Sequence, residues 1–177
     1  MSVVQPPPLQ GISPAALLGE NVLGIDHVAV AVADLAGAVE WAVGKLGCVL
    51  LEERETQGKF SGMKSAVLKL GGFVVVLVQG TSSESQVTQF VAHHGPGVQH
   101  IALRVQDVAQ AATTLESRGM TFSTPKLDGE NLSQIFSLRD PVTGLMIELI
   151  ERRNGYTGFS DENVSRLFRS LEQRQIF

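Results

Sequence analysis

The chain has 177 residues, a formal net charge of −4 and 44% hydrophobic residues, which fits one globular unit or two small halves sharing a core. The negative charge and the lack of a basic run argue against a nucleic-acid partner, and no apolar stretch reaches the roughly 18 residues of a membrane helix. The start lacks the regions of a signal peptide and the single cysteine, Cys48, excludes an internal disulfide, so we expect a cytoplasmic protein.

The first half of the chain predicts one strand, one helix and then three more strands. Residues 1–23 are rich in proline and glycine and predict an extended arm. Asp34 follows the first strand at the position of a helix N-cap, and Gly47 ends the helix. The expected strands are Ile25–Val32, Cys48–Glu55, Ser65–Leu70 and Phe73–Gln79, with Thr56–Lys64 as a polar loop.

The second half repeats this order after a connector and a short helix over Gln86–Ala92. Asp107 and Gly119 take the places of the earlier N-cap aspartate and terminal glycine. The expected strands are Val98–Val105, Met120–Ser123, Gln134–Leu138 and Leu145–Glu151, with a loop over Thr124–Asn131.

The order βαβββ therefore occurs twice, which predicts an α+β fold of paired modules. The charged residues Glu151–Arg153 are expected to form a polar exit from the last strand. An amphipathic helix follows, with Ser160 or Asp161 as its N-cap. The expected boundaries are 1–23 for the arm, 24–153 for the domain with its modules 24–80 and 98–151, and 154–177 for the C-terminal helix.

Two strands of the same design carry histidines, in the sequences GIDHVAVAV and GVQHIALRV. Alternation places His27 and His100 each on one face together with the alanine two residues later, which leaves room beside the ring. The same alternation places Gln99 on the opposite, core-facing side. If the two modules are related by a pseudo-twofold axis, their first strands meet and the two histidines converge.

The last strand carries a carboxylate between apolar neighbours. Glu148 shares a face with Met146 and Ile150, and burying it costs several kcal/mol unless it is paired or binds a metal. Two histidines and one carboxylate are the set that holds non-haem Fe(II) with open positions. The repeat aligns Val76 with Glu148, and Gln79 is expected on the other face, so the first half provides one ligand and the second half two.

With these features the chain resembles the vicinal oxygen chelate superfamily over residues 24–151. In that superfamily, paired βαβββ modules form a cupped mixed sheet around a divalent metal. The segment SQVTQFVAHHGPGVQHIALRVQDV is similar to the C-terminal domain of 4-hydroxyphenylpyruvate dioxygenases and hydroxymandelate synthases. Three further segments, LSQIF, MIELIERR and GFSDENVSRLFRSLEQRQ, resemble the same family, the last one its terminal helix that closes the active site.

The resemblance implies roles for individual residues. His27, His100 and Glu148 are the implied iron ligands, and Gln134 matches a glutamine near the metal. Phe159 matches an aromatic residue that packs over the substrate ring. The further substrate contacts expected here are Phe136, Ser65 and Asn163.

Three hypotheses for the function follow. The first is an Fe(II)-dependent oxygenase that combines dioxygen with a 2-oxo acid or similar chelating small molecule. The second is a metal-dependent isomerase, epimerase or lyase, with Zn, Ni, Co or Mn as possible metals and Glu53 or Glu55 as the base. The third is a metal-free binding protein that resembles the bleomycin-resistance members. Members of the superfamily commonly pair, so we expect a homodimer.

Overall fold

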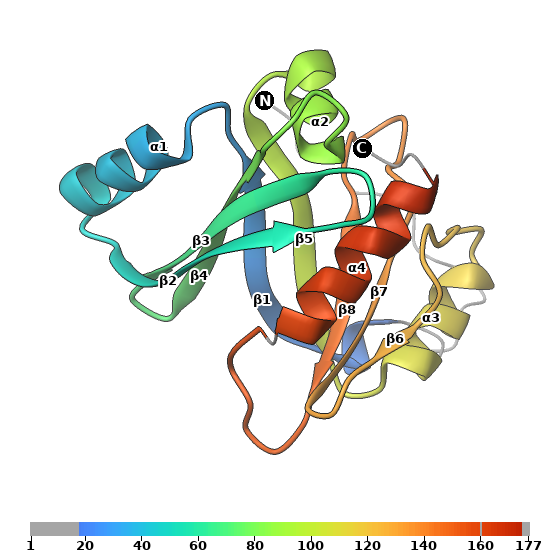
Figure 1. Ribbon diagram of the computed structural model, residues 1–177. Coiled ribbons are helices and arrows are strands. Elements are labelled where there is room, and N and C mark those ends of the chain that lie inside the picture. Colours follow the sequence, from blue (N-terminus) through green and yellow to red (C-terminus); the bar gives the residue numbers. More distant parts are fainter. Residues whose placement is uncertain (1–17, 160, 175–177) are drawn as a thin grey trace, which may run out of the picture.

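The computed structural model describes residues 18–159 and 161–174 (Figure 1). Most of the expected arm, residues 1–17, therefore lies outside the described part of the chain. A short 3-10 helix, η2 (Leu18–Glu20), precedes the first strand. Within the described residues, no helix is both long enough and apolar enough to cross a membrane.

Both βαβββ modules are present and join into one sheet of eight strands. In the first module the elements are β1 (Val22–Ala31), α1 (Leu35–Trp41) with the π-helical turn η3 (Ala42–Leu46), β2 (Val49–Gln57), β3 (Gly62–Leu70) and β4 (Phe73–Gly80). After α2 (Gln86–His94), the second module has β5 (Gly97–Val105), α3 (Val108–Glu116), β6 (Leu127–Asp128), β7 (Leu132–Phe136) and β8 (Ile147–Arg152), and α4 (Asp161–Arg174) follows.

The strand order in the sheet is β2-β3-β4-β1-β5-β8-β7-β6. The first strands of the two modules, β1 and β5, pair antiparallel at the centre, and each pairs in parallel with the last strand of its own module. The second half of the order mirrors the first, as the predicted pseudo-twofold arrangement requires. The prediction of paired modules in a mixed sheet is confirmed.

The helix ends of the two modules also correspond. The side chain of Asp34 accepts a hydrogen bond from the backbone N–H of Gly37, and Asp107 accepts one from Gln110. Gly47 follows η3 with a φ of 71°, a left-handed conformation that favours glycine. The predicted N-caps of α1 and α3 are therefore confirmed, whereas the candidates for α4, Ser160 and the side chain of Asp161, lie outside the described residues.

Two local predictions are wrong. The expected loop Thr56–Lys64 is much shorter, because Thr56 pairs with Met63 and extends the hairpin of β2 and β3. The expected strand Met120–Ser123 is reduced to one isolated bridge between Phe122 and Ser137, and the short strand β6 lies in the expected loop instead. In both places the pairing depends on a partner strand that local composition does not reveal.

The helices divide the two faces of the sheet. One core cluster packs α1 against β3 and β4, and another packs α3 against β5, β7 and β8. On the other face, α2 packs against β1 and β4, and α4 contacts β2 and β6, the two edge strands. Figure 1 shows α4 crossing in front of β7 and β8. This helix covers a cavity between the two halves of the curled sheet.

Candidate metal centre

Three side chains from different strands meet in this cavity. His27 lies on β1, His100 on β5 and Glu148 on β8, and one donor atom of each lies within 4.8 Å of the other two. Oε2 of Glu148 is 3.3 Å from Nε2 of His27 and 3.4 Å from Nε2 of His100. The two Nε2 atoms are 3.4 Å apart. The structure therefore brings together the three residues that the sequence predicts as metal ligands.

Strand pairing explains this convergence. In the antiparallel pair β1–β5, His27 lies opposite Ala102. By the same symmetry, His100 lies opposite Ala29. Glu148 enters from the parallel strand β8, where it also pairs with Ala102. The small alanine side chains leave the space in which the two rings and the carboxylate meet.

The residue before each histidine holds the imidazole ring in place. The register of β1 and β5 shifts at Asp26 and again at Gln99, so each is a bulged residue. Oδ1 of Asp26 accepts a hydrogen bond from Nδ1 of His27 at 2.9 Å, and Oε1 of Gln99 accepts one from Nδ1 of His100. Each Nε2 is thereby left for a metal. The prediction that Gln99 faces the core is wrong, because the bulge turns its side chain into the cavity.

Burial and neighbouring charges set the protonation of the metal-free site. Burial opposes a charge on His27, but the Glu148 carboxylate and the hydrogen bond to Asp26 outweigh it and raise the pKa of His27 to about 9. Burial lowers the pKa of His100. Burial also acts to raise the pKa of Glu148, but His27 and His100 more than reverse this, so that pKa lies below its ordinary value. The site thus holds an imidazolium–carboxylate pair beside a neutral imidazole.

This protonation predicts a pH-dependent metal affinity. Because a metal at Nε2 must displace the proton of His27, the apparent affinity should rise about tenfold per pH unit between pH 7 and about 9 and then level off. Calorimetric titration with Co(II), repeated in buffers of different ionisation enthalpy, measures both the affinity and the number of protons released per metal. Release of about one proton per metal is expected at pH 7. An affinity that stays constant over this range would contradict the prediction.

The cavity contains most of the expected substrate contacts. Its volume is about 90 Å³, and its walls are mostly apolar. Gln134 and Phe136 of β7, Ser65 of β3 and Phe159 before α4 all line it. The Phe159 ring packs edge-on against His27 at 5.0 Å between centroids, and the Phe136 ring packs against His100 in the same way at 5.1 Å. Asn163 belongs to α4, but its side chain lies outside the described residues.

Besides Gln99, sequence reasoning missed two further polar residues of the cavity. Arg54 of β2 reaches it and donates to the carbonyl oxygen of Phe159 at 2.6 Å. Gln86, the first residue of α2, is 5% exposed, and its Oε1 atom has no hydrogen-bond partner among the described residues. A charged strand such as Glu52–Glu55 and a polar helix start are ordinary surface patterns, so no local signal marks either residue.

The first module offers no fourth ligand. Val76 lies opposite Ala29 on β4 just as Glu148 lies opposite Ala102 on β8. Gln79 accepts a hydrogen bond from the backbone N–H of Leu35 at 2.8 Å and does not line the cavity. The predicted positions of Val76 and Gln79 are both confirmed.

The donor set fits a divalent metal. Metal–ligand distances of about 2.1 Å with angles of about 90–110° place neighbouring donors about 3.0–3.4 Å apart. The three measured separations are 3.3, 3.4 and 3.4 Å. His27 is 3% exposed and Glu148 is 1% exposed, so a cation there is shielded from water. Two imidazoles and one carboxylate form the facial set typical of non-haem iron, and zinc also accepts these ligands.

Known sequences match this chain over most of the two modules. Residues 26–136 match the family model described as Glyoxalase/Bleomycin resistance protein/Dioxygenase superfamily. A 4-hydroxyphenylpyruvate dioxygenase from Pseudomonas aeruginosa is 29% identical over 155 residues, which cover 69% of this chain and 43% of that protein. The chain spans about half the length of the curated relatives it matches.

Solved structures share the fold, including those of a synthase and an epimerase. A mutant of 4-hydroxymandelate synthase from Streptomyces coelicolor has a TM-score of 0.75 and 25% identity, covering 86% of this chain and 54% of that chain. Methylmalonyl-CoA epimerase from Mycobacterium tuberculosis has a TM-score of 0.64 and 31% identity, covering 74% of this chain and 89% of that chain. Because the family model matches more than half of the sequence, across both modules, the chain belongs to the Glyoxalase/Bleomycin resistance protein/Dioxygenase superfamily.

Proposed function

We propose that the chain is a non-haem Fe(II)-dependent oxygenase that acts on a 2-oxo acid or similar chelating small molecule, with dioxygen as second substrate. The observation that carries this proposal is the three-donor set of His27, His100 and Glu148, with Val76 in the place of a fourth donor. Three protein ligands leave about three of six octahedral positions open. With Fe(II) held by these residues, a chelating 2-oxo acid and dioxygen would together need that number of positions.

The chain's own residues hold the metal and the substrate. Bound Fe(II) supplies the redox chemistry that lets dioxygen react with an organic substrate. Asp26 and Gln99 keep the two histidines in the tautomer whose Nε2 atom is a ligand. In this proposal, Gln134 and Ser65 hydrogen-bond the polar end of the substrate.

The apolar walls hold the remainder of the substrate. Phe136 and Phe159 flank the site on either side, with Asn163 as a further proposed contact from α4. Val67, Val78 and Leu132 complete a lining that suits an apolar side chain. The helix α4 covers the cavity and excludes water from the reaction.

Anaerobic Fe(II) titration followed by addition of alkyl and aryl 2-oxo acids tests the proposal. Chelation by a 2-oxo acid should give a visible charge-transfer band, and admission of air should then give substrate-dependent oxygen uptake. Glu148→Ala, treated identically, is the control, because it lacks the carboxylate ligand. The absence of both signals with every member of the panel would rule out the oxygenase.

The likeness to methylmalonyl-CoA epimerase favours a second candidate, a metal-dependent epimerase, isomerase or lyase. Such a reaction needs a base beside the substrate. Glu53 and Glu55, the expected candidates, are exposed and do not line the cavity, where Glu148 is the single carboxylate among the described residues. Exchange of a substrate α-proton with deuterated water in the absence of oxygen would favour this candidate over the oxygenase.

A further inference from the structure

Asp26 connects one histidine of the metal site to a buried arginine. The Asp26 side chain is 7% exposed, and its Oδ1 atom accepts a hydrogen bond from Nδ1 of His27 at 2.9 Å. The same carboxylate accepts two bonds from Arg152, from Nε at 2.6 Å and from Nη2 at 2.8 Å. Two parallel bonds of this kind fix the plane of the guanidinium as well as its position. The Arg152 side chain is 3% exposed, so water competes little for these contacts.

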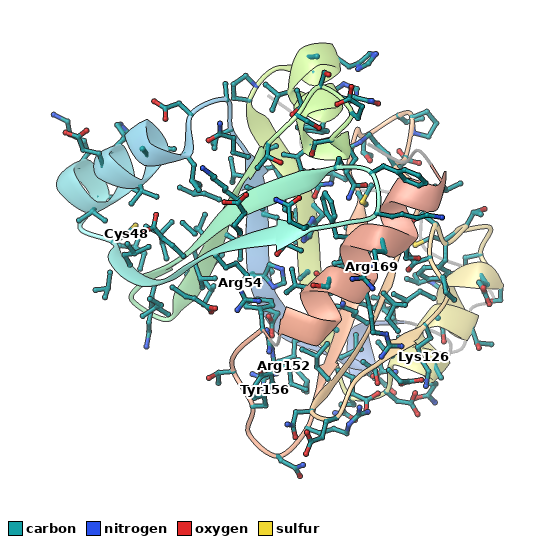
Figure 2. All side chains as sticks on the ribbon, in the orientation of Figure 1. Cys48, Arg54, Lys126, Arg152, Tyr156 and Arg169 are labelled. Carbon is teal, nitrogen blue, oxygen red and sulfur yellow. The ribbon has the colours of Figure 1, made fainter. Side chains whose placement is uncertain are left out.

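Arg152 also holds the segment that leads into α4. Its third nitrogen, Nη1, donates to the carbonyl oxygen of Gly158 at 2.7 Å, and its guanidinium lies 4.9 Å from the centre of the Phe159 ring. The Phe159 ring in turn meets the ring of His27 edge-on. Figure 2 shows Arg152 close to the start of α4. The contacts therefore form a closed circuit through His27, Asp26, Arg152 and Phe159.

The equivalent residue of the second module lacks this connection. The Gln99 side chain binds His100, and its backbone carbonyl accepts a bond from Nη2 of Arg139 at 2.8 Å. Arg139 lies in the turn between β7 and β8, and its guanidinium packs over the ring of Phe90 of α2. The partner of His27 is thus charged and tied to the segment that closes the cavity, whereas the partner of His100 is neutral and is not.

We propose that Asp26 and Arg152 are positioning residues that couple metal binding at His27 to closure of Gly158, Phe159 and α4 over the cavity. The inference rests on the metal site of the proposed function and is independent of the reaction. A metal at Nε2 holds the His27 ring in one orientation, and the ring holds the carboxylate of Asp26. Asp26 in turn orients the Arg152 guanidinium, which contacts Gly158 and Phe159. Because such coupling is reciprocal, closure also raises the affinity for the metal.

Hydrogen–deuterium exchange with Co(II) alone as the probe tests the coupling. In the wild-type chain, saturating Co(II) should slow exchange in peptides covering Gly158, Phe159 and α4 by about fivefold or more, the range of ordinary coupling energies. In Asp26→Asn and in Arg152→Gln, Co(II) at saturation should leave exchange in these peptides unchanged. Arg152→Lys keeps the positive charge but cannot form the two parallel hydrogen bonds to Asp26, so it should restore part of the response.

Gln99→Leu is the matched control, because it removes the partner of the other histidine. Its Co(II) affinity should fall about 10- to 100-fold, as for the loss of any partner of a ligating histidine. At saturating Co(II), however, its C-terminal peptides should slow as much as those of the wild type. The thermal midpoint and circular dichroism of each variant establish that it is folded, and Asp26→Asn alone tests the loss of the response if Arg152→Gln does not fold.

The outcomes separate the two proposals. A wild-type response that persists in Asp26→Asn, or that Gln99→Leu also abolishes, would overturn the coupling through Asp26 and Arg152. Co(II) binding without any response of α4 in the wild type would overturn it too, and would leave the oxygenase proposal intact. A wild-type chain that binds no Co(II) would overturn the metal site and both proposals with it.

Discussion

Glu148→Ala should abolish divalent-metal binding while the chain stays folded. Glu148 is the one anion of the three-donor set, and the two neutral imidazoles that remain bind a dication weakly. The loss of affinity should exceed the about 100-fold that removal of an outer-shell partner alone can cause. Metal analysis of protein purified without chelators, together with calorimetric Co(II) titration, measures this loss.

Two further variants test the same assignment, one by removing another donor and one as a control. His100→Ala should behave like Glu148→Ala, since it removes another donor of the same set. Gln134→Ala is the matched control: it lines the same cavity, and it should retain the metal and lose turnover instead. Stoichiometric metal in Glu148→Ala or His100→Ala would show that the site lies elsewhere.

Phe168→Ala should release α4 from the cavity. Phe168 is 1% exposed and lines the cavity with Val164 and Leu167 of the same helix. Truncation of a buried phenylalanine costs about 3–5 kcal/mol in a rigid core. Because α4 touches the sheet mainly at the edge strands β2 and β6, we expect the loss as local opening of this helix.

Hydrogen exchange in α4 should therefore become faster by more than about tenfold in Phe168→Ala, while the unfolding midpoint of the sheet changes little. The KM for any substrate found should rise as well, since water enters the cavity. Arg169→Ala is the control, because the exposed neighbour (labelled in Figure 2) lies on the same helix turn. Equal exchange in both variants, or global unfolding of Phe168→Ala, would contradict the assignment of α4 as a separable cover.

The repeat made the fold and the convergence of the three donors predictable. Each module repeats a histidine strand and a helix with an aspartate N-cap, Asp34 or Asp107, and each of these signals is local. Two copies of one pattern imply a symmetric junction, and that junction brings His27 and His100 together. Glu148 followed from the cost of a buried carboxylate.

The two bulges could not be predicted, because they depend on pairing between distant strands. Alternation along a single strand places Gln99 on the opposite face of the strand from His100, toward the core. The register shift arises only where β5 meets β1, since Ala29 pairs with His100 whereas the next residue, Val30, pairs with Val98. The alternation of residues along the sequence of β5 does not reveal this extra, unpaired residue.

The prediction of a polar exit at the end of β8 is wrong for Arg152, whose side chain is 3% exposed, for a similar reason. Glu151–Arg153 has the composition of a solvated strand exit, yet each side chain has a distant partner. Arg152 pairs with Asp26, Glu151 accepts from the backbone N–H of Val108, and Arg153 donates to Ser133. These contacts join residues that are far apart in the sequence and meet only in the folded chain. Composition alone therefore predicts that the run lies at the surface.

Val76 shows what internal duplication offers to evolution. Each position within one βαβββ module has a counterpart in the other module, and the two copies can diverge independently. The copy of Glu148 in the first module already points into the cavity with the correct register, but it carries an isopropyl group. A carboxylate at Val76 would add a fourth donor without moving the backbone. A single substitution at Val76 can thus change a three-donor site, which has room for two substrates, into a four-donor site that suits acid–base chemistry. Changes of this kind let one scaffold host unrelated reactions.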